Sequence, residues 1–330
     1  MSQKRTADRS PSTTFPEFDP ALTEAYELIA NQTRMRILIA LWEVIEPGLA
    51  RHPLTFTELR NRLGKPDPGN LNYHLNALTG RFIDRTEDGY VIRYSGLKIV
   101  HSVAASAGFS DASIELTPID VACPHCGGQT AVRYEDEALY HVCTECDGTF
   151  SSPEFEEGVL GASSVEPAAT VGRDVEELHA LCQLEYFLSG FYHMQGICPN
   201  CRGPVERSLL VCEQHDDGKM CDTCGRVESV RGQFSCSVCK SWSILKLQNC
   251  IALHPAVVSF HYDRGITYSW DTQQKNFVEL ALQVTESDAV LVQSDPPRVI
   301  VRMTGDDSEL RLTIDENLDV VEIETCDEDC

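Results

Sequence analysis

Residues 56–94 have hydrophobic positions whose spacing predicts two helices separated by a tight turn. Thr57 can cap the first helix, and Gly64 follows its last turn, where a glycine is favoured. Pro66 and Pro68 then keep the next few residues out of helical conformation. The pattern therefore predicts a helix, a turn and a second helix.

The second helix has one apolar face and one polar face. Leu71, Leu75 and Leu78 recur at i, i+4 and i+7, which is the spacing of positions that face a core. The opposite face carries amide and aromatic side chains, namely Asn70, Asn72, Tyr73 and Asn76. Amide groups can pair with adenine in the major groove of DNA, so we expect this face to contact base edges.

A hairpin is predicted after this helix, with strands over residues 82–86 and 90–94 joined at Asp88 and Gly89. Two helices joined by a turn and followed by a hairpin make a winged helix-turn-helix. Arginines in and beside the hairpin could reach phosphate or the minor groove, and these are Arg81, Arg85 and Arg93. A winged helix that only contacts proteins is the alternative, because a fold alone does not fix a function.

Four segments together resemble ArsR-type winged-helix transcription regulators. They are LIANQTRMRILIAL at 28–41, FTELRNRLG at 56–64, GNLNYHLNALTGRFI at 69–83 and DGYVIRYSGLKI at 88–99. The resemblance implies a DNA-binding domain over residues 20–110. It further implies a homodimer whose interface is formed by the helices that flank the helix-turn-helix. It also implies metal-ion sensing, but the first 122 residues contain no cysteine, so a thiolate sensor site on the reading helix is absent.

The whole chain is predicted to be an α+β, multi-domain protein. Residues 1–19 are polar and interrupted by proline, which is typical of a disordered arm. Ser95 can cap a helix that runs to about residue 107, and a long apolar helix is expected over residues 173–196. Both helices are candidates for the dimer interface. Residues 151–172 are rich in Ser, Ala, Gly and Glu and are predicted to be a linker.

The last part of the chain, residues 251–325, is predicted to be a small α+β domain with an antiparallel sheet. Helices are expected over 254–262 and 273–282. Four strands follow, two of which show alternating apolar and polar positions over 298–303 and 310–314. We find no catalytic constellation in this segment.

The charge of the chain is strongly acidic and unevenly distributed. There are 51 acidic and 27 basic residues, a net charge of -24, and only 7 of the bases are lysine. This composition resembles that of proteins from salt-accumulating archaea. Residues 1–110 carry 13 bases and 12 acids, whereas residues 111–330 carry 14 bases and 39 acids. The predicted DNA-binding domain is therefore the one large part of the chain that phosphate does not repel.

All fifteen cysteines follow residue 122, and ten of them form five Cys-x-x-Cys pairs. The N-terminal residues lack the apolar segment of a signal peptide, and no run of residues is long enough to span a membrane. The pairs therefore predict metal binding in a reducing cytoplasm rather than a disulfide framework.

The first metal site is predicted over residues 120–150, where a Cys-x-x-Cys pair lies at each end of an expected hairpin. Such a zinc ribbon supplies four thiolates to one zinc ion. The ligands are Cys123, Cys126, Cys143 and Cys146. A redox dithiol is the alternative, although it would need only one of the pairs on a βαβ unit.

A second cysteine array occupies residues 197–250 and offers eight ligands, Cys198, Cys201, Cys212, His215, Cys221, Cys224, Cys236 and Cys239. In one arrangement the first and third pairs share one zinc and the second and fourth pairs share another, which resembles a RING-like cross-brace. In the rival arrangement a single ribbon uses two of the three Cys-x-x-Cys pairs and leaves Cys212 and His215 idle. The chain should therefore bind two or three zinc ions.

These patterns favour a sequence-specific DNA-binding transcription regulator that acts as a homodimer on double-stranded DNA. A second hypothesis is an interaction module of the general transcription machinery, without strong sequence preference. A zinc enzyme is a third, but it would need an open coordination position that Cys-rich sites do not offer. We therefore expect no enzymatic activity.

Overall fold

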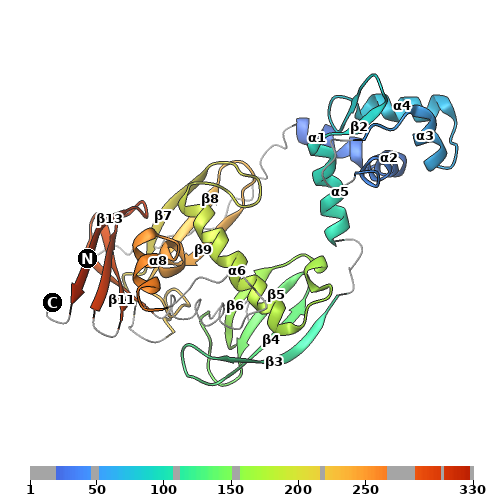
Figure 1. Ribbon diagram of the computed structural model, residues 1–330. Helices are drawn as coiled ribbons and strands as arrows, with labels where there is room; N and C mark the ends of the chain where they lie inside the picture. The colour runs from blue at the N-terminus through green and yellow to red at the C-terminus, as the bar shows by residue number, and fades with distance from the viewer. Residues whose placement is uncertain are drawn as a thin grey trace, which may run out of the picture. The chain divides into compact units, whose positions relative to one another are not determined.

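The computed structural model describes residues 20–45, 52–106, 112–150, 157–215, 220–265, 287–305 and 308–327 (Figure 1). The chain divides into two compact units, Met1–Gly108 and Phe109–Cys330. Both helices and strands are present, and the sheets are antiparallel. The predicted arm over 1–19 and the predicted helix over 273–282 lie outside the described residues.

The described part of the first unit consists of helices and one hairpin. The elements are α1 (Pro20–Ile29), α2 (Gln32–Trp42), α3 (Phe56–Arg62), α4 (Pro68–Leu78), β1 (Ile83–Arg85), β2 (Tyr90–Ile92) and α5 (Tyr94–Ser106). Strands β1 and β2 pair antiparallel, with Ile83 opposite Ile92. The helices, turn and hairpin therefore follow the order that the sequence pattern predicts.

The N-terminal cap of α3 is Thr55, so the prediction that Thr57 caps this helix was wrong. Thr55 Oγ1 accepts a hydrogen bond from the Glu58 backbone N–H (3.2 Å), while Glu58 Oε2 accepts one from the Thr55 N–H (2.8 Å). This reciprocal capping box satisfies two N–H groups at once, whereas Thr57 lies inside the first turn. At the other end of α3, Gly64 takes the positive φ of +82°.

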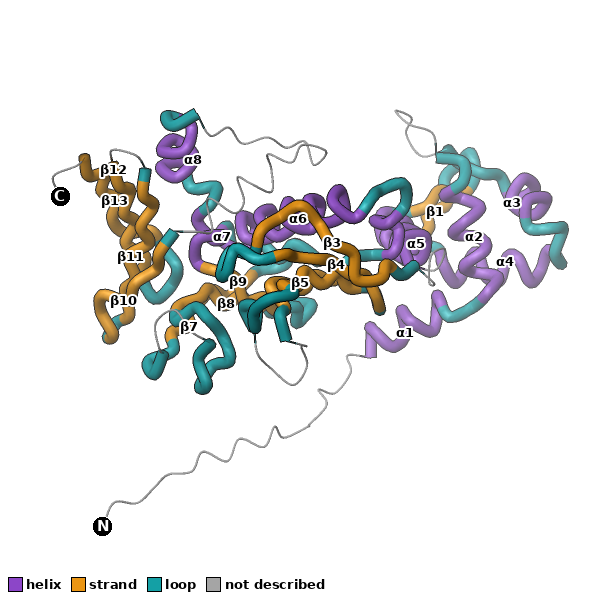
Figure 2. The backbone as a smooth tube through the Cα atoms, turned by 90° about the horizontal axis from the view of Figure 1, so that it is seen from below, coloured by secondary structure: helices purple, strands orange, loops and turns teal. Residues whose placement is uncertain are grey.

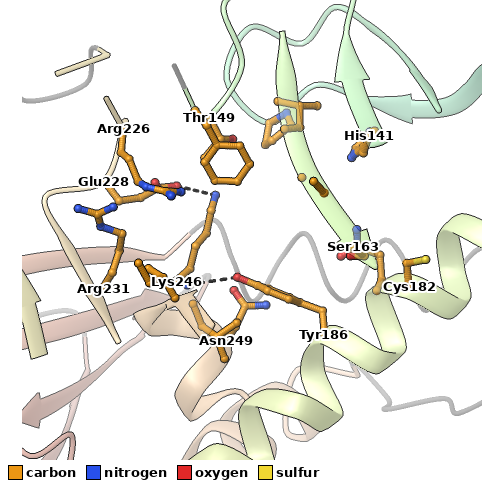
Figure 3. Close-up of a pocket in the computed structure, with 18 of the residues that line it drawn as sticks. His141, Thr149, Ser163, Cys182, Tyr186, Arg226, Glu228, Arg231, Lys246 and Asn249 are labelled. Carbon is orange, nitrogen blue, oxygen red and sulfur yellow. Dashed lines mark hydrogen bonds and ion pairs between the residues drawn. The ribbon is translucent and has the colours of Figure 1, made fainter. Parts of the chain in front are cut away.

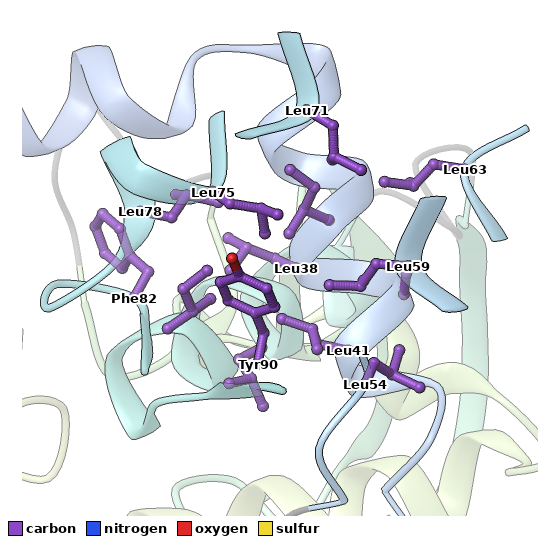
Figure 4. Close-up of a cluster of buried hydrophobic side chains, with 14 of the residues drawn as sticks. Leu38, Leu41, Leu54, Leu59, Leu63, Leu71, Leu75, Leu78, Phe82 and Tyr90 are labelled. Carbon is purple, nitrogen blue, oxygen red and sulfur yellow. The ribbon is translucent and has the colours of Figure 1, made fainter. Parts of the chain in front are cut away.

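The core of the first unit lies between α2, α3, α4 and the hairpin (Figure 4). The predicted apolar face of α4 is fully buried there, with Leu71, Leu75 and Leu78 all at 0% exposure. Ser95, predicted to cap α5, instead lies within its first turn, where its hydroxyl donates to the carbonyl of Arg81. The contact ties α5 to the segment between α4 and β1.

The second unit begins with a four-stranded antiparallel sheet in the order β3-β4-β5-β6. Its strands are β3 (Ile114–Ala122), β4 (Gln129–Glu135), β5 (Ala138–Cys143) and β6 (Val159–Ser164). The linker predicted over 151–172 was therefore wrong for its described part. β6 completes the sheet by pairing with β5, and a 3-10 helix, Pro167–Thr170, follows it. The strand was not predicted because small residues such as Gly161 and Ala162 give no alternating pattern of large apolar and polar positions.

The described residues in the rest of the second unit form two further sheets and two short helices. The elements are β7 (Val205–Val211), β8 (Val230–Cys236), β9 (Trp242–Lys246), α7 (Leu247–Ile251), α8 (Pro255–Tyr262), β10 (Asp288–Ser294), β11 (Pro297–Thr304), β12 (Ser308–Ile314) and β13 (Val320–Asp327). One core joins them, since Phe234 on β8 and Leu247 on α7 belong to the same buried cluster as Val301 and Leu312. The predicted domain boundary between residues 250 and 251 therefore cuts through a shared core.

Helix α6 (Val175–Met194) links the two parts of the second unit, the β3–β6 sheet and the part that contains β7–β9 and α7 (Figure 2). Its first half packs Leu178 and Cys182 into the core of the β3–β6 sheet. In its second half, the His193 ring stacks on Phe234 with the ring centroids 4.8 Å apart. No helix among the described residues is long and apolar enough to cross a membrane.

Gly190 lies at a close approach of α6 to α7. A Cβ atom at this position would lie 2.9 Å from the carbonyl oxygen of Asn249, which is closer than real Cβ atoms come. In the middle of a helix, glycine costs about 0.5–1 kcal/mol relative to alanine. The close packing of the two helices therefore explains why a glycine occupies this position.

We expect Gly190→Ala to destabilise the protein by about 1–2 kcal/mol, because overpacking costs about 1–3 kcal/mol and outweighs the gain in helix propensity. Denaturant unfolding of the metal-saturated protein measures the change. Gly161→Ala is the matched control, since a Cβ atom there has no neighbour within 4 Å. Equal or greater stability of Gly190→Ala would show that the helices do not pack as closely as described.

Candidate metal centres

The first candidate centre lies at one end of the β3–β6 sheet, where two Cys-x-x-Cys turns meet. Strand β4 pairs with β5 so that Thr130 lies opposite Cys143, which brings the second turn beside the first. The distance between the Cys123 and Cys146 sulfurs is 3.7 Å, and that between the Cys126 and Cys143 sulfurs is 3.6 Å. The four predicted ligands are thus brought together.

These sulfur distances fit a four-coordinate metal. A tetrahedral site with metal–sulfur bonds of about 2.3 Å has sulfur–sulfur edges of about 3.8 Å. A disulfide would require a separation of about 2.05 Å, and the cysteines of the described residues are free thiols. The side chains are therefore spaced as metal ligands are.

The second array forms two groups, and each predicted arrangement was correct only in part. The interleaved arrangement gave two groups of four ligands but the wrong pairs, and the rival gave one group of two Cys-x-x-Cys pairs but left Cys212 and His215 idle. Cys198, Cys201, Cys236 and Cys239 make one group, and Cys212, His215, Cys221 and Cys224 make the other. The first pair thus joins the fourth, and the second joins the third. The groups are nested rather than interleaved as in a cross-brace, and Cys212 and His215 are not idle.

The register of the β7–β8 hairpin explains this nesting. Val205 lies opposite Cys236 at one end of the hairpin, and Val211 lies opposite Val230 at the other. The outer pairs therefore meet at the open end of the hairpin, while the inner pairs lie together in the connecting loop. The Cys198–Cys239 and Cys201–Cys236 sulfur distances are 3.6 and 3.5 Å.

In the connecting loop, His215 presents one ring nitrogen to the sulfurs and holds the other away. Its Nδ1 lies 3.6 Å from the Cys224 sulfur, and its Nε2 lies 2.8 Å from the carbonyl oxygen of Val227. Because a carbonyl can only accept, Nε2 carries the proton and Nδ1 has a free lone pair. A fixed tautomer of this kind is typical of a histidine that ligates a metal.

Four of the five Cys-x-x-Cys turns share one backbone geometry. In each, the N–H of the first cysteine donates to the carbonyl five residues later, as Cys123 does to Gly128 (2.9 Å). The residue after the second cysteine has a positive φ, and these residues are Gly127, Arg202, Gly225 and Lys240. Backbone N–H groups also point at the sulfurs, for example Gly203 N at 3.3 Å from Cys201 Sγ. These turns are thus shaped to stabilise thiolates.

The same contacts change the acidity of individual thiols. A hydrogen bond from the Cys224 N–H lowers the pKa of Cys221 to about 6. Burial raises the pKa of Cys198, but the nearby Ser241 hydroxyl, 3.3 Å from its sulfur, and backbone N–H groups outweigh it and bring the pKa to about 6. Ser241 was not singled out from the sequence, since nothing in its spacing relates it to Cys198.

In the first unit, the four side chains predicted to face DNA bases are all exposed on α4; they are Asn70, Asn72, Tyr73 and Asn76. Tyr73 is 63% exposed, and the Arg34 guanidinium lies 5.9 Å from its ring centroid.

The three predicted arginines of the first unit differ in their partners. Arg81 pairs with Glu24 at 3.0 Å, and Arg93 pairs with Asp84 at 3.3 Å and donates to the carbonyl of Gly80. Arg85 is exposed and lies over the Tyr90 ring at 5.9 Å. Among the described residues it has no carboxylate partner.

The fold and these sites define a protein of mixed α and β structure, whose described residues form three candidate metal centres, each made of four Cys or His side chains. The chain belongs to the family described as Domain of unknown function (DUF7351), which matches residues 120–320. A second family, Domain of unknown function (DUF7347), matches residues 22–103. Neither a curated protein nor a solved structure matches the chain.

Paired substitutions should reveal which cysteines share an ion. With three centres per chain, Cys198→Ser with Cys239→Ser should remove one ion, because both belong to one centre. Cys198→Ser with Cys221→Ser should remove two. Metal analysis of the purified variants measures this, and Cys250→Ala, a buried thiol outside the centres, should retain all ions. Loss of one ion from the second pair and two from the first would restore the interleaved arrangement.

Proposed function

We propose that the protein is a sequence-specific DNA-binding transcription regulator whose first unit is an ArsR-type winged helix-turn-helix. The observation that carries the proposal is the row of exposed amides on α4, opposite a face that is fully buried. A helix held this way can place Asn72 and Asn76 against base edges in the major groove. Arg85, on the hairpin, is the candidate for a phosphate or minor-groove contact.

Charge supports the assignment of DNA binding to the first unit. Residues 1–110 have nearly equal numbers of acidic and basic side chains, while the remaining residues carry an excess of 25 acidic ones. A polyanion is therefore repelled least by the first unit. Arg81 can also exchange Glu24 for phosphate at small cost, since exposed ion pairs contribute about 1 kcal/mol or less.

We further propose that the three centres hold zinc in a structural role, with the first centre forming a zinc ribbon. Four thiolates, or three thiolates and one imidazole, are ligand sets that structural zinc uses. Each set fills all four positions of a tetrahedron and leaves none for a substrate or an activated water. We therefore propose that the protein is a regulator and not an enzyme. Metal analysis of the purified protein should find zinc rather than iron.

The proposal includes a homodimer, because one recognition helix reads too few base pairs for a specific site. Exposed apolar side chains on α1 and α5, Tyr26 and Val103, supply a candidate surface for the partner subunit. The alternative is an interaction module of the general transcription machinery, which the combination of a winged helix and zinc ribbons also suits. Such a module would not require sequence preference.

Selection from random duplex DNA separates the two functions. A regulator should enrich a pseudo-palindrome with half-sites about 34–36 Å apart, because a two-fold dimer presents two recognition helices to successive turns of the major groove. Light scattering of the selected complex should give two chains per duplex. An unenriched pool bound equally by the protein would favour the interaction module.

Two substitutions should separate base reading from phosphate binding. Asn72→Ala should relax preference at one or two positions by about 1–3 kcal/mol and leave the salt dependence nearly unchanged. Arg85→Ala should weaken binding to all sequences and reduce the salt slope by about one unit, because one phosphate contact is lost. Binding isotherms on matched and scrambled duplexes at several salt concentrations measure both effects.

High salt sharpens this comparison. In molar salt, counterion release contributes little, so Arg85→Ala should appear mild while Asn72→Ala stays severe. Asn61→Ala, an exposed amide on α3 rather than α4, is the control. Unchanged specificity in a folded Asn72→Ala protein would rule out α4 as the reading helix.

A further inference from the structure

A cavity of about 250 Å³ lies inside the second unit (Figure 3). It is bounded by β5, β6 and the turn between them, by α6, and by the β7–β8 loop, the β8–β9 hairpin and α7. Neither the metal centres nor the proposed DNA-binding unit uses it. It is slightly smaller than the pockets of about 300–1,000 Å³ that hold drug-sized ligands. Its size therefore suits a small organic molecule.

One side of the cavity is positively charged. Arg226, Arg231 and Lys246 line it together with a single carboxylate, Glu228. Lys246 Nζ lies 2.8 Å from Glu228 Oε1, so this carboxylate already has a cationic partner. In the part of the chain that the structure describes, neither arginine pairs with a carboxylate, although Arg231 is only 6% exposed. Two guanidinium groups beside a cavity, in a chain of net charge -24, favour an anionic ligand.

The floor of the cavity has a buried amide that lacks partners. Asn249 is 2% exposed, and neither its Oδ1 nor its Nδ2 has a hydrogen-bond partner among the described residues. Leaving both ends of a buried amide unsatisfied is unfavourable, so such a group is rare without a ligand or water. Nearby, the Tyr186 hydroxyl accepts a hydrogen bond from the Lys246 N–H (3.2 Å), which fixes α6 against the hairpin.

The remaining walls are mainly apolar and aromatic. The Phe150 ring lies under the Arg226 guanidinium, 4.5 Å from centroid to Cζ. Ile244 and Leu160 add aliphatic surface, and Trp242 lines the cavity although it is 75% exposed. Burial lowers the pKa of His179 to about 4, so this lining residue is neutral at physiological pH. The surroundings suit an apolar body better than a polyhydroxylated one.

We propose that this cavity binds a small organic carboxylate with an apolar or aromatic body. The carboxylate pairs with Arg226 and Arg231, the Asn249 amide hydrogen-bonds to the ligand, and Phe150 and Trp242 cover its apolar part. The inference goes beyond the proposed function, because it concerns only the second unit. The test of ligand binding to this cavity is therefore independent of whether the protein binds DNA.

The metal centres shape this cavity, since two of its walls are continuous with ligand turns. Phe150 follows the turn of Cys146, and Arg226 follows that of Cys224. An isolated bridge pairs Phe150 with Arg226 and joins the two turns directly. Removal of the metal should therefore abolish binding of the carboxylate.

Calorimetry on the full-length, metal-loaded protein at fixed ionic strength tests the proposal. Benzoate and phenylacetate should bind at one site per chain, and the neutral amides benzamide and phenylacetamide should bind at least tenfold more weakly. Inorganic phosphate, an anion without an apolar body, should compete poorly. Equal affinity for acid and amide, binding of phosphate alone, or no binding to a protein that retains its metals would each overturn the proposal.

Arg231→Gln should weaken carboxylate binding at least tenfold. Arg207→Gln is the matched control on the neighbouring strand β7, because its guanidinium is occupied by the carbonyl of Met194 (2.8 Å) and by Asp319 (2.9 Å). Trp242→Ala changes an exposed residue and provides a second variant if Arg231→Gln does not fold. It should weaken phenylacetate more than acetate, and a folded Trp242→Ala protein with unchanged selectivity for the aromatic acid would contradict the assigned site.

Discussion

The second unit depends on the burial of α6, a helix of 20 residues with apolar positions on more than one face. A helix of this kind must be covered on several sides, because burying a large apolar side chain contributes about 1.5–3 kcal/mol of stabilising free energy, which is lost when the side chain stays exposed. The β3–β6 sheet covers Leu178 and Cys182, while the β8–β9 hairpin and α7 cover the second half near Gly190. The two surfaces meet α6 at different places, and the cavity lies where they do not close on each other.

The candidate metal centres suit the small size of these sheets. A three-stranded sheet such as β7–β8–β9 encloses little apolar surface, and small folds commonly gain stability from a bound metal. In the nested pairing, one centre joins the two chain segments at the open end of the β7–β8 hairpin. The other centre holds together the loop that connects the two strands. Because the β7–β8 ladder lies between them, loss of one centre would leave backbone hydrogen bonds that support the other.

Local features could be predicted from the sequence, whereas features set by register could not. Leu71, Leu75 and Leu78 define a buried face through their spacing alone, and the alternation of Val299 and Val301 defines a strand. The Cys-x-x-Cys turns were also visible, because each is a local motif. Which turns share a centre depends on the β7–β8 register, and so the interleaved pairing was wrong. The cavity could not be predicted at all, because Arg231, Asn249 and Phe150 come from distant segments.

The cavity has a physical consequence for the second unit. Its charged lining comes from the β7–β8 loop, β8 and β9, and its opposite wall comes from the β3–β6 sheet and α6. One ligand would therefore contact both parts of the unit that carry candidate metal centres. Such a ligand favours the arrangement of the two walls that fits it over any arrangement with a different spacing. It can shift this equilibrium only by the difference between its affinities for the two arrangements. A carboxylate paired with Arg226 and Arg231 should have a large difference of this kind, because Nε of Arg231 and both polar atoms of the nearby Asn249 amide lack hydrogen-bond partners among the described residues. A neutral ligand would use only the apolar wall and would shift the arrangement much less.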